Sequence, residues 1–244
     1  LAAANLDIRF GQILELTSFC ATSPGLIEKV DLEVVKDSCG RYASRIDAWV
    51  VIIELGAIHR QVLNTRSDTI SAPLPVYPRE NEHATLLRVE ERSRNTGEPH
   101  FAEVFQGILL QEGVVSAGQY VHLADGRNAM LYVGIAAQSL SEDLASLAAD
   151  HDIIYAIVDP THRIVARSVG IEHAMFADVP EWFVENIDNG TAGASLGMSG
   201  PDVLGGTWNA GYTPLKNAQG WMAVALEPTL EKAFVWAPWS TPTV

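Results

Sequence analysis

The sequence predicts an α+β protein in which a long N-terminal helix precedes two mainly antiparallel sheets of about five strands each, flanked by helices. Two observations predict this class. Apolar residues recur with helical spacing over residues 1–23. The chain then reads strand–strand–helix–strand–strand–strand twice, and "LGAIHRQVLNTRSD" (55–68) has a near copy in "DPTHRIVARSVG" (159–170). Hairpins and meanders favour antiparallel sheets, and a long unit present in two copies predicts tandem domains.

The composition is that of a folded protein and disfavours two kinds of partner. The 244 residues, 48% of them hydrophobic, can bury one large core or two smaller ones. The formal net charge of -14 argues against nucleic acid and against broad contact with an anionic membrane surface. The sequence holds no apolar run of about 18 residues, so nothing in it is expected to span a bilayer. It has no initiator Met and no signal-peptide pattern, so we expect an excised piece of a longer protein, whose flanking parts could include membrane segments.

The N-terminal region, 1–42, is predicted to be helical. In the first helix Leu6, Phe10 and Ile13 lie on one face, and "TSPG" ends it at Pro24. A second helical stretch runs to Tyr42. The two cysteines, Cys20 and Cys39, favour buried free thiols; a disulfide between the two helices is the alternative outside the cytoplasm, and a metal site lacks partner ligands.

The first repeated unit begins with the buried strand "AWVVIIEL" (48–55) and its hairpin partner "QVLNTR" (61–66). "SAPLPVYP" (71–78) is predicted to be a surface loop because of its three prolines. An amphipathic helix over 80–97 ends at a Gly, and three strands follow, at 100–107, 114–124 and 129–137.

The second unit begins with a helix over 139–150, for which Ser139 or Ser141 is the expected N-cap. The hairpin 153–168 follows. We then expect a short helix over 179–190, three strands at 193–198, 206–215 and 220–228, and a last helix over 229–236.

Enzyme signatures do not occur in the sequence. It contains no G-x-S-x-G, no H-E-x-x-H and no Walker A loop, and its seven histidines never recur at i, i+4 on one helix. The glycine-rich "LGMSGPDVLGG" (196–206) lies between strands with no following helix N-terminus, so a loop is favoured over a phosphate site. We therefore expect no catalytic residue, no metal and no cofactor.

The order of several motifs resembles the double Cache sensor domain, a tandem PAS-like module found outside the membrane in bacterial receptors. The motifs are "AWVVIIELGAIHRQVLNTR", "TGEPHFAEVFQG", "YVHLADGRNAMLYVGIA", "IIYAIVDPTHRIVARS" and "GTWNAGYTPLKNAQGWMAVALEP". The resemblance covers residues 43–228.

The resemblance implies a membrane-distal Cache domain at 43–139, a membrane-proximal one at 140–230 and a return segment toward the membrane at 231–244. It places the chain in the periplasmic, extracytoplasmic part of an inner-membrane receptor. A histidine kinase is favoured as output module, with a diguanylate cyclase or a chemoreceptor as the alternatives. The N-terminal helix would transmit the signal. Its apolar stripe is expected to pack on its own sheets, with a parallel homodimer as the alternative.

A small-molecule site is expected between the first sheet and its covering segment. Arg66 or His100 would pair with a ligand carboxylate. The full set of candidates is Trp49, Asn64, Arg66, His100, Phe101, Tyr120, His122 and Tyr132. Core packing is the alternative role for the aromatic residues, and a solvated strand end is the alternative for Arg66.

An α-amino acid ligand is not favoured, because the R-x-x-W pattern of the amino-acid-binding branch of the family is missing from "HATLLRVEERSRNTG" (83–97). A smaller site in the second unit would use Arg167, Trp208, Tyr212 and Trp221. The His-Arg pairs of the two hairpins are interpreted as turn and strand-edge residues. The alternative function is a structural or dimerisation module with empty cavities that senses through a partner protein.

Overall fold

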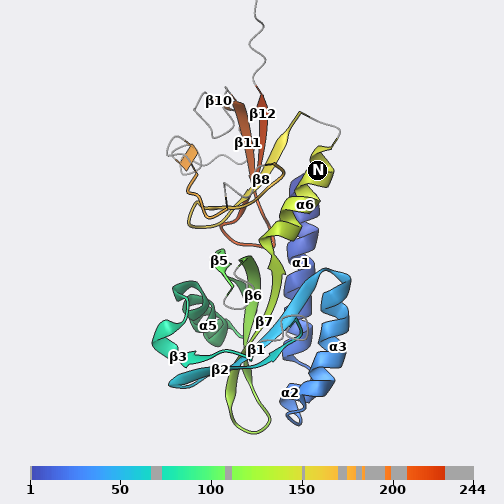
Figure 1. The fold of residues 1–244 in the computed structure, drawn as a ribbon, viewed down its shortest axis with the longest axis vertical. Coiled ribbons are helices and arrows are strands. Elements are labelled where there is room, and N and C mark those ends of the chain that lie inside the picture. The colour runs from blue at the N-terminus through green and yellow to red at the C-terminus, as the bar shows by residue number, and fades with distance from the viewer. Residues whose placement is uncertain are drawn as a thin grey trace, which may run out of the picture.

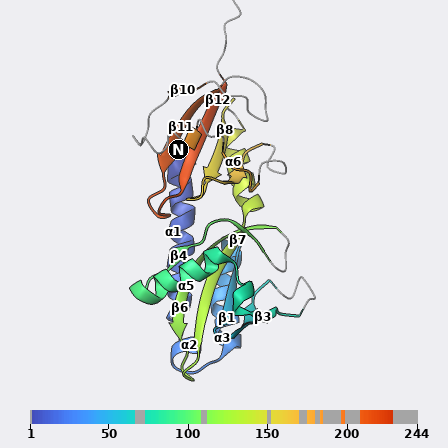
Figure 2. The ribbon, with the colours of Figure 1, turned by 90° about the vertical axis from the view of Figure 1, so that its left-hand side faces the viewer.

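The protein is elongated, and two antiparallel sheets follow one another along its length, as the computed structural model shows (Figures 1 and 2). The structure describes residues 2–66, 73–107, 112–149, 152–169, 175–179, 183–184, 196–198 and 208–228. Helix α1 (Ala2–Ala21) runs beside both sheets and contacts β6 and β7 of the first and β12 of the second. The expected α+β class with a long N-terminal helix is confirmed.

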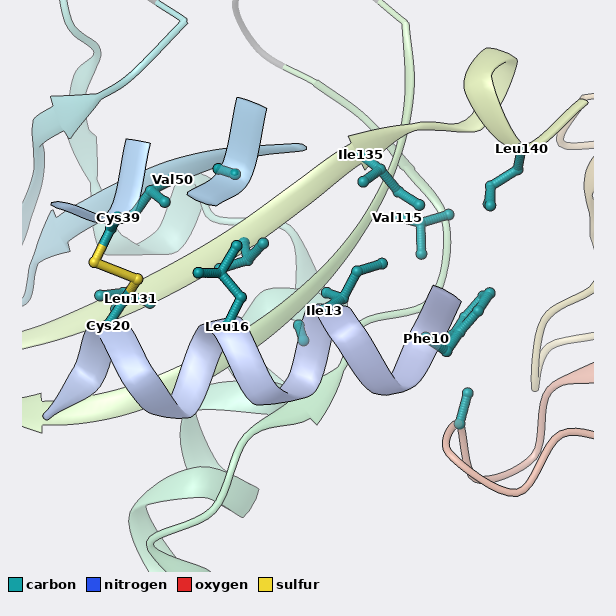
Figure 3. Close-up of a cluster of buried hydrophobic side chains, with 14 of the residues drawn as sticks. Phe10, Ile13, Leu16, Cys20, Cys39, Val50, Val115, Leu131, Ile135 and Leu140 are labelled. Atoms are coloured by element: carbon teal, nitrogen blue, oxygen red, sulfur yellow. A yellow bond between two sulfur atoms is a disulfide. The ribbon is translucent and has the colours of Figure 1, made fainter. Parts of the chain in front are cut away.

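The apolar stripe of α1 packs against the protein's own sheets. Leu6, Phe10, Ile13 and Leu16 are buried at helical spacing, and Figure 3 shows Phe10, Ile13 and Leu16 directed at the strands. The short helix α2 (Pro24–Ile27) follows, with Pro in its first turn. Helix α3 (Leu32–Arg45) begins at the N-cap Asp31, whose carboxylate accepts a hydrogen bond from Val34 N at 3.3 Å.

A disulfide joins Cys20 of α1 to Cys39 of α3 (Figure 3). The preference for free thiols was therefore wrong, and the alternative of a bridge between the first two helical segments is correct. The two Cα atoms lie 5.8 Å apart, within the usual range for a disulfide, and both residues are fully buried.

The first sheet has the strand order β3-β2-β1-β7-β6-β4, and β5 also pairs with β6. Its strands are β1 (Ala48–Glu54), β2 (Ile58–Asn64), β3 (Val76–Pro78), β4 (His100–Phe101), β5 (Phe105–Gln106), β6 (Gly113–His122) and β7 (Asn128–Ala136). Helices α1 and α3 cover one face. Helix α5 (Ala84–Thr96) covers the other and ends at Gly97, whose φ of 76° is left-handed.

Two segments of this sheet differ from expectation. The predicted loop 71–78 contains the three-residue edge strand β3, followed by the single 3-10 turn η1 (Arg79–Asn81). The predicted strand 100–107 is broken into β4 and β5. The break arises because Glu103 N donates to Thr85 Oγ1 at 2.8 Å and Val104 N donates to Asp159 Oδ2 at 3.1 Å, so neither amide joins the sheet.

The second sheet has the order β10-β11-β12-β8-β9. Its strands are β8 (Ile154–Val158), β9 (Ile164–Arg167), β10 (Leu196–Met198), β11 (Trp208–Pro214) and β12 (Met222–Pro228). Helix α6 (Ala137–Ala148) leads into it directly from β7, so Ala136 is the N-cap and provides no side-chain cap. The expectation of Ser139 or Ser141 as N-cap was wrong. Ser141 lies inside the helix and bonds to Ala137 O.

The two sheets meet at an aromatic cluster. Phe10 of α1 packs against Phe101 of β4, with ring centroids 4.8 Å apart, and against Trp221, which precedes β12, at 5.3 Å. The turn between β11 and β12 also holds α1, since Lys216 N and Asn217 N donate to Asp7 Oδ1 at 2.6 and 3.2 Å. Helix α1 is therefore fixed to both sheets.

Several expected elements fall beyond the described ranges. The helix 229–236 and the return segment 231–244 lie outside them, as does the helix 179–190 apart from Val179 and the helical pair at 183–184. No helix within the described ranges is both long and apolar enough to cross a membrane.

Candidate ligand-binding site

A cavity of about 70 Å³ lies between the first sheet and helix α5. Strands β1, β2, β6 and β7 form its floor, and the start of α5 and β5 form its roof. The lining residues are Trp49, Val51, Ile53, Gln61, Asn64, Tyr77, His83, Leu86, Phe105, Gly107, Val114, Ser116, Tyr132 and Gly134. Most of this wall is apolar, with a few polar groups, which is the composition typical of a ligand pocket.

Two aromatic side chains on the floor are placed by glycines on the neighbouring strands. Trp49 pairs with Gly134, where an added Cβ would lie 3.1 Å from the indole ring. Tyr132 pairs with Gly118, where an added Cβ would lie 2.3 Å from the phenol ring. A side chain at position 118 would displace the Tyr132 ring, and one at position 134 would crowd the Trp49 ring, so the two glycines leave room for these aromatic side chains.

Ser116, in the middle of β6, carries the polar group that most directly indicates a ligand. Its side chain lines the cavity and is 2% exposed, yet its Oγ has no hydrogen-bond partner in the described part of the chain. A buried hydroxyl without a partner costs about 1–3 kcal/mol relative to one that is hydrogen-bonded. A molecule in the cavity would be placed to bond to it.

Asn64 and Gln61 bring side-chain amides to the same cavity from β2. Asn64 Nδ2 donates to Gln61 Oε1 at 3.3 Å, and Asn64 Oδ1 accepts from Arg66 N at 3.0 Å. Each amide group has both donor and acceptor atoms, so the pair can rearrange to bind either kind of ligand atom.

Arg66 follows the end of β2, and its partly exposed side chain contacts a residue that lines the cavity. Its guanidinium lies over the Trp49 ring, 4.6 Å from the centroid, and Nη1 is 2.9 Å from Glu112 Oε1. The stacking and the ion pair hold a positive charge next to an aromatic wall of the cavity.

His59, Glu82 and Tyr77 form a buried polar group at the β2–β3 edge. Glu82 Oε2 lies 3.1 Å from His59 Nδ1 and accepts from Tyr77 Oη at 2.9 Å. The interpretation of His59 as a turn or strand-edge residue was wrong, because it is 1% exposed. Burial and then the Glu82 carboxylate raise the pKa of Tyr77, so this phenol is a neutral donor.

Tyr132, on the floor of the cavity, is also a neutral phenol. Burial first, and then the charges of Glu82 and Glu90, raise the pKa of Tyr132 well above its usual value. Its phenol oxygen is 3.4 Å from Leu86 O, the longest acceptable distance for a hydrogen bond, so the group can turn to a ligand.

The other four candidates of the first sheet lie away from this cavity. Phe101 packs in the aromatic cluster of α1, and Tyr120 packs against His122 and under Arg94. His122 lies 2.8 Å from Asn128 Oδ1, and His100 bonds to Thr96. Burial lowers the pKa of His100, followed by the charge of Arg92. The structure therefore brings together Trp49, Asn64 and Tyr132, with Arg66 adjacent.

The candidates of the second sheet are buried in its core. Trp221 is 1% exposed within the aromatic cluster, and Tyr212 packs against Phe183. Arg167 is also buried, and its Nε donates to Val169 O at 2.7 Å. The side chain of Trp208 lies outside the described residues. Within the described ranges, no three His, Cys, Asp or Glu side chains gather where they could hold a metal ion.

No protein-family model and no curated protein matches the chain. Solved structures do match. The extracellular ligand-binding receptor from Desulfohalobium retbaense superposes with a TM-score of 0.65 at 10% identity over 93% of this chain, and the chain spans 38% of that receptor's length. The ligand-binding domain of Pseudomonas fluorescens chemoreceptor CtaA, in complex with L-isoleucine, superposes with a TM-score of 0.63 at 11% identity. The match covers 93% of this chain and 88% of the CtaA domain. The chain has the fold of a chemoreceptor sensory domain.

A third match is the ligand-binding domain of the Pseudomonas aeruginosa amino acid chemoreceptor PctC in complex with GABA. Its TM-score is 0.57 at 13% identity, and it covers 93% of this chain and 94% of its own. The Cache fold expected from the sequence is thus confirmed. These three solved structures are sensory or ligand-binding domains of receptors.

Sequence reasoning missed several residues that line the cavity of this Cache fold. Gln61, Tyr77, His83, Phe105 and Ser116 were not among the candidates. Gln61 could not have been found by alternation from Asn64, because a β-bulge in the β1–β2 pairing shifts the register and brings Gln61 to the face of Asn64. Ser116 carries no signal either, since a serine in a strand is ordinary until its neighbours are known.

Proposed function

We propose that this chain is the sensor region of a bacterial transmembrane receptor and that it binds a small molecule in the cavity between the first sheet and α5. The observation that carries the proposal is the Ser116 hydroxyl, which is buried in the cavity wall without a partner. Two side-chain amides and two neutral phenols surround the same space, so a ligand with several polar atoms would be fully hydrogen-bonded.

The ligand class that we propose is a small carboxylate-bearing molecule. Arg66 lies over the ring of Trp49, which lines the cavity, and a guanidinium presents paired donors that match a carboxylate. The molecules bound to the solved sensory domains, L-isoleucine and GABA, both carry a carboxylate. Glu112, which now pairs with Arg66, would have to release it or bind a positive group of the same ligand.

Signal transmission is proposed to run through α1. Strand β1 carries Trp49 and packs against α3, and the disulfide joins α3 to α1 at Cys20. Helix α1 in turn is bonded to the β11–β12 turn through Asp7. A ligand that repacks the first sheet would bias the position of this helix relative to the second sheet.

The location that we propose is extracytoplasmic, in an inner-membrane protein with a histidine kinase as output. The disulfide supports an oxidising compartment. The start of α1 and the end of β12 lie toward the same end of the molecule, beside the second sheet (Figures 1 and 2). This arrangement supports a membrane-distal domain at 43–139 and a membrane-proximal domain at 140–230.

The second candidate function, a structural module with empty cavities, is favoured by one observation. The cavity holds about 70 Å³, whereas pockets for drug-sized ligands hold about 300–1,000 Å³. A ligand of few atoms or an outward movement of α5 is needed for binding. A homodimer of such modules would sense through a partner protein instead.

Thermal unfolding in the presence of a metabolite library separates the two functions. A ligand at a hundredfold excess over its dissociation constant stabilises the folded state by about 2.7 kcal/mol. We expect a carboxylate to raise the unfolding temperature of the wild type and of Arg60→Ala, a control on the exposed face of β2, but not of Arg66→Ala. If no compound stabilises the wild type, the structural module is the better account.

A further inference from the structure

A second cavity, separate from the first, lies at the junction of the two sheets. It holds about 410 Å³. Its walls come from the first turns of α5, from the segment between β4 and β5, and from the β8–β9 turn. The lining residues are His83, Ala84, Thr85, Arg88, Val104, Phe105, Gln106, Arg163 and Phe176.

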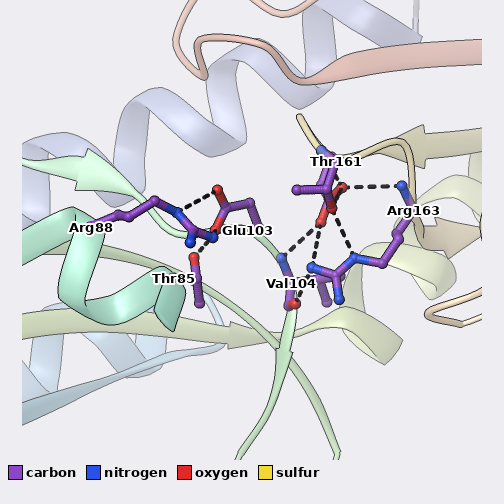
Figure 4. A network of polar contacts seen from close by, with 7 residues as sticks. Thr85, Arg88, Glu103, Val104, Thr161 and Arg163 are labelled. Carbon is purple, nitrogen blue, oxygen red and sulfur yellow. Dashed lines mark hydrogen bonds and ion pairs between the residues drawn. The ribbon is translucent and has the colours of Figure 1, made fainter. Parts of the chain in front are cut away.

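Two arginines from different parts of the chain face this cavity on either side of Val104 (Figure 4). Arg88 donates from Nε and Nη2 to the Glu103 carboxylate, at 3.3 and 2.7 Å. Arg163 donates from Nε to Thr161 Oγ1 at 2.9 Å, and from Nη2 to Val104 O at 3.0 Å and to Asp159 Oδ2 at 3.3 Å.

These contacts leave donors unused on both guanidinium groups. A guanidinium carries five N–H donors, two of them on Nη1. Nη1 of Arg88 and Nη1 of Arg163 make no hydrogen bond to any described residue. The carboxylates of Glu103 and Asp159 are not among the lining groups, so the arginines, and not their acids, form the wall.

We propose that this junction cavity is a second binding site and that it takes a small oxyanion, either a carboxylate or a phosphate. Arginine binds both through paired, charge-assisted hydrogen bonds. Both arginines are ion-paired, with Glu103 and Asp159, but the guanidinium groups line the cavity and the two carboxylates do not. The first turn of α5, which contains no acidic residue, adds a favourable field.

Binding at this site would act on the first cavity. His83 and Phe105 line both cavities, and their rings are 5.2 Å apart. Arg163 also donates a hydrogen bond to Val104 O, next to Phe105, so an anion bound by Arg163 would change the contacts of this segment. The two sites would therefore be coupled, and each ligand would change the affinity for the other by the same factor. Occupation of the junction site itself does not require a ligand in the first cavity.

The test measures thermal unfolding and calorimetric titration of the whole chain with sodium phosphate, sulfate and citrate, at an ionic strength kept constant with sodium chloride. We expect at least one anion to bind saturably. Arg88→Gln should weaken this binding about tenfold or more, because a charge-assisted hydrogen bond is lost. Arg92→Gln removes the same charge one turn later on the exposed surface of α5 and should leave the affinity unchanged.

The arms of the test separate the outcomes. Binding of citrate alone assigns a carboxylate, and binding of phosphate or sulfate alone assigns a phosphate-like group; either supports the site. Saturable binding that Ser116→Ala leaves intact places the anion outside the first cavity. The proposal is overturned if chloride produces the same shift, if Arg88→Gln binds like the wild type, or if both arginine variants lose affinity equally.

Discussion

The carboxylate of Asp159 accepts a hydrogen bond from the main-chain amide of Val104 at 3.1 Å, across the junction of the two sheets (Figure 4). Asp159 is fully buried, and its other oxygen accepts from Thr161 N, Thr161 Oγ1 and Arg163 N. Arg163 completes the contact by donating to Val104 O. Both main-chain polar atoms of Val104, in the segment between β4 and β5, are thus bound by residues between β8 and β9.

Asp159→Ala should destabilise the protein strongly. The change leaves the main-chain amide of Val104 and the donors of the β8–β9 turn without their acceptor, and each buried donor left unsatisfied costs about 1–3 kcal/mol. Urea unfolding measures the loss, and hydrogen exchange should show faster exchange of the Val104 amide. Asp37→Ala, which breaks an exposed pair with Arg41 on α3, should cost under about 1 kcal/mol. Equal losses of unfolding free energy in the two variants would show that the junction contact stabilises the protein no more than an exposed ion pair does.

Ser116→Ala should separate stability from binding. Removing a buried hydroxyl without a partner leaves the unfolding free energy of the ligand-free protein unchanged or raises it by about 1 kcal/mol. The thermal shift produced by the ligand should fall. Ser93→Ala is the matched control, because Ser93 Oγ accepts from Tyr120 N at 2.8 Å. Ser93→Ala should lose about 1 kcal/mol of unfolding free energy and keep the thermal shift produced by the ligand. If Ser116→Ala keeps that shift and Ser93→Ala loses it, the ligand does not bind at Ser116.

Reduction of the Cys20–Cys39 disulfide should lower the unfolding free energy by about 2–4 kcal/mol, since the bridge closes a loop across 19 positions of sequence. Urea unfolding with and without a reductant measures this difference. The double variant Cys20→Ala, Cys39→Ala should unfold like the reduced protein and should not respond to the reductant. Identical midpoints for the oxidised and reduced wild type would contradict a stabilising role.

Glu103 should make the unfolding free energy of the protein depend on pH at acidic pH. Burial would raise its pKa, but the hydrogen bonds from Arg88 and Thr85 and the charge of Arg88 outweigh it and hold the pKa of Glu103 below its usual value. A lowered pKa in the folded state means that the stabilisation is present above the unfolded pKa of about 4.3 and is lost as the pH falls through the folded pKa.

The difference in unfolding free energy between wild type and Glu103→Gln should therefore be largest near pH 7 and shrink below about pH 4.3. Glu91→Gln, on the exposed surface of α5, the helix that carries Arg88, should differ little from the wild type at any pH. A Glu103→Gln difference that stays constant from pH 7 to pH 3 would rule out the charge of Glu103 as its cause.

Much of the fold could be predicted from the sequence because its determinants are local. The period of Leu6, Phe10 and Ile13 identifies α1, and the β-branched run of β1 identifies a buried strand. The break at 102–104 could not be predicted, since its amides bond to Thr85 and Asp159, 18 and 55 positions away. The disulfide likewise depends on how α1 and α3 pack.

The site was predictable only in part for the same reason. Trp49 and Tyr132 stand out because large aromatic side chains on buried strands face either a core or a cavity. Ser116 becomes informative only through what its hydroxyl fails to contact, and such an absence has no signal in the sequence. Arg163 was interpreted as a turn or strand-edge residue. It forms a β-bridge with Asp178 just before β9, and its guanidinium bonds to Val104 O in the segment between β4 and β5.

The position of the bound ligand in a crystal structure tests the central claim most directly. The crystal should contain the compound that gives the largest thermal shift. We predict that it lies between Trp49 and Tyr132, with a polar atom within hydrogen-bond distance of Ser116 Oγ and its carboxylate directed at Arg66. Density for that compound elsewhere, with the cavity beneath α5 empty, would contradict the account.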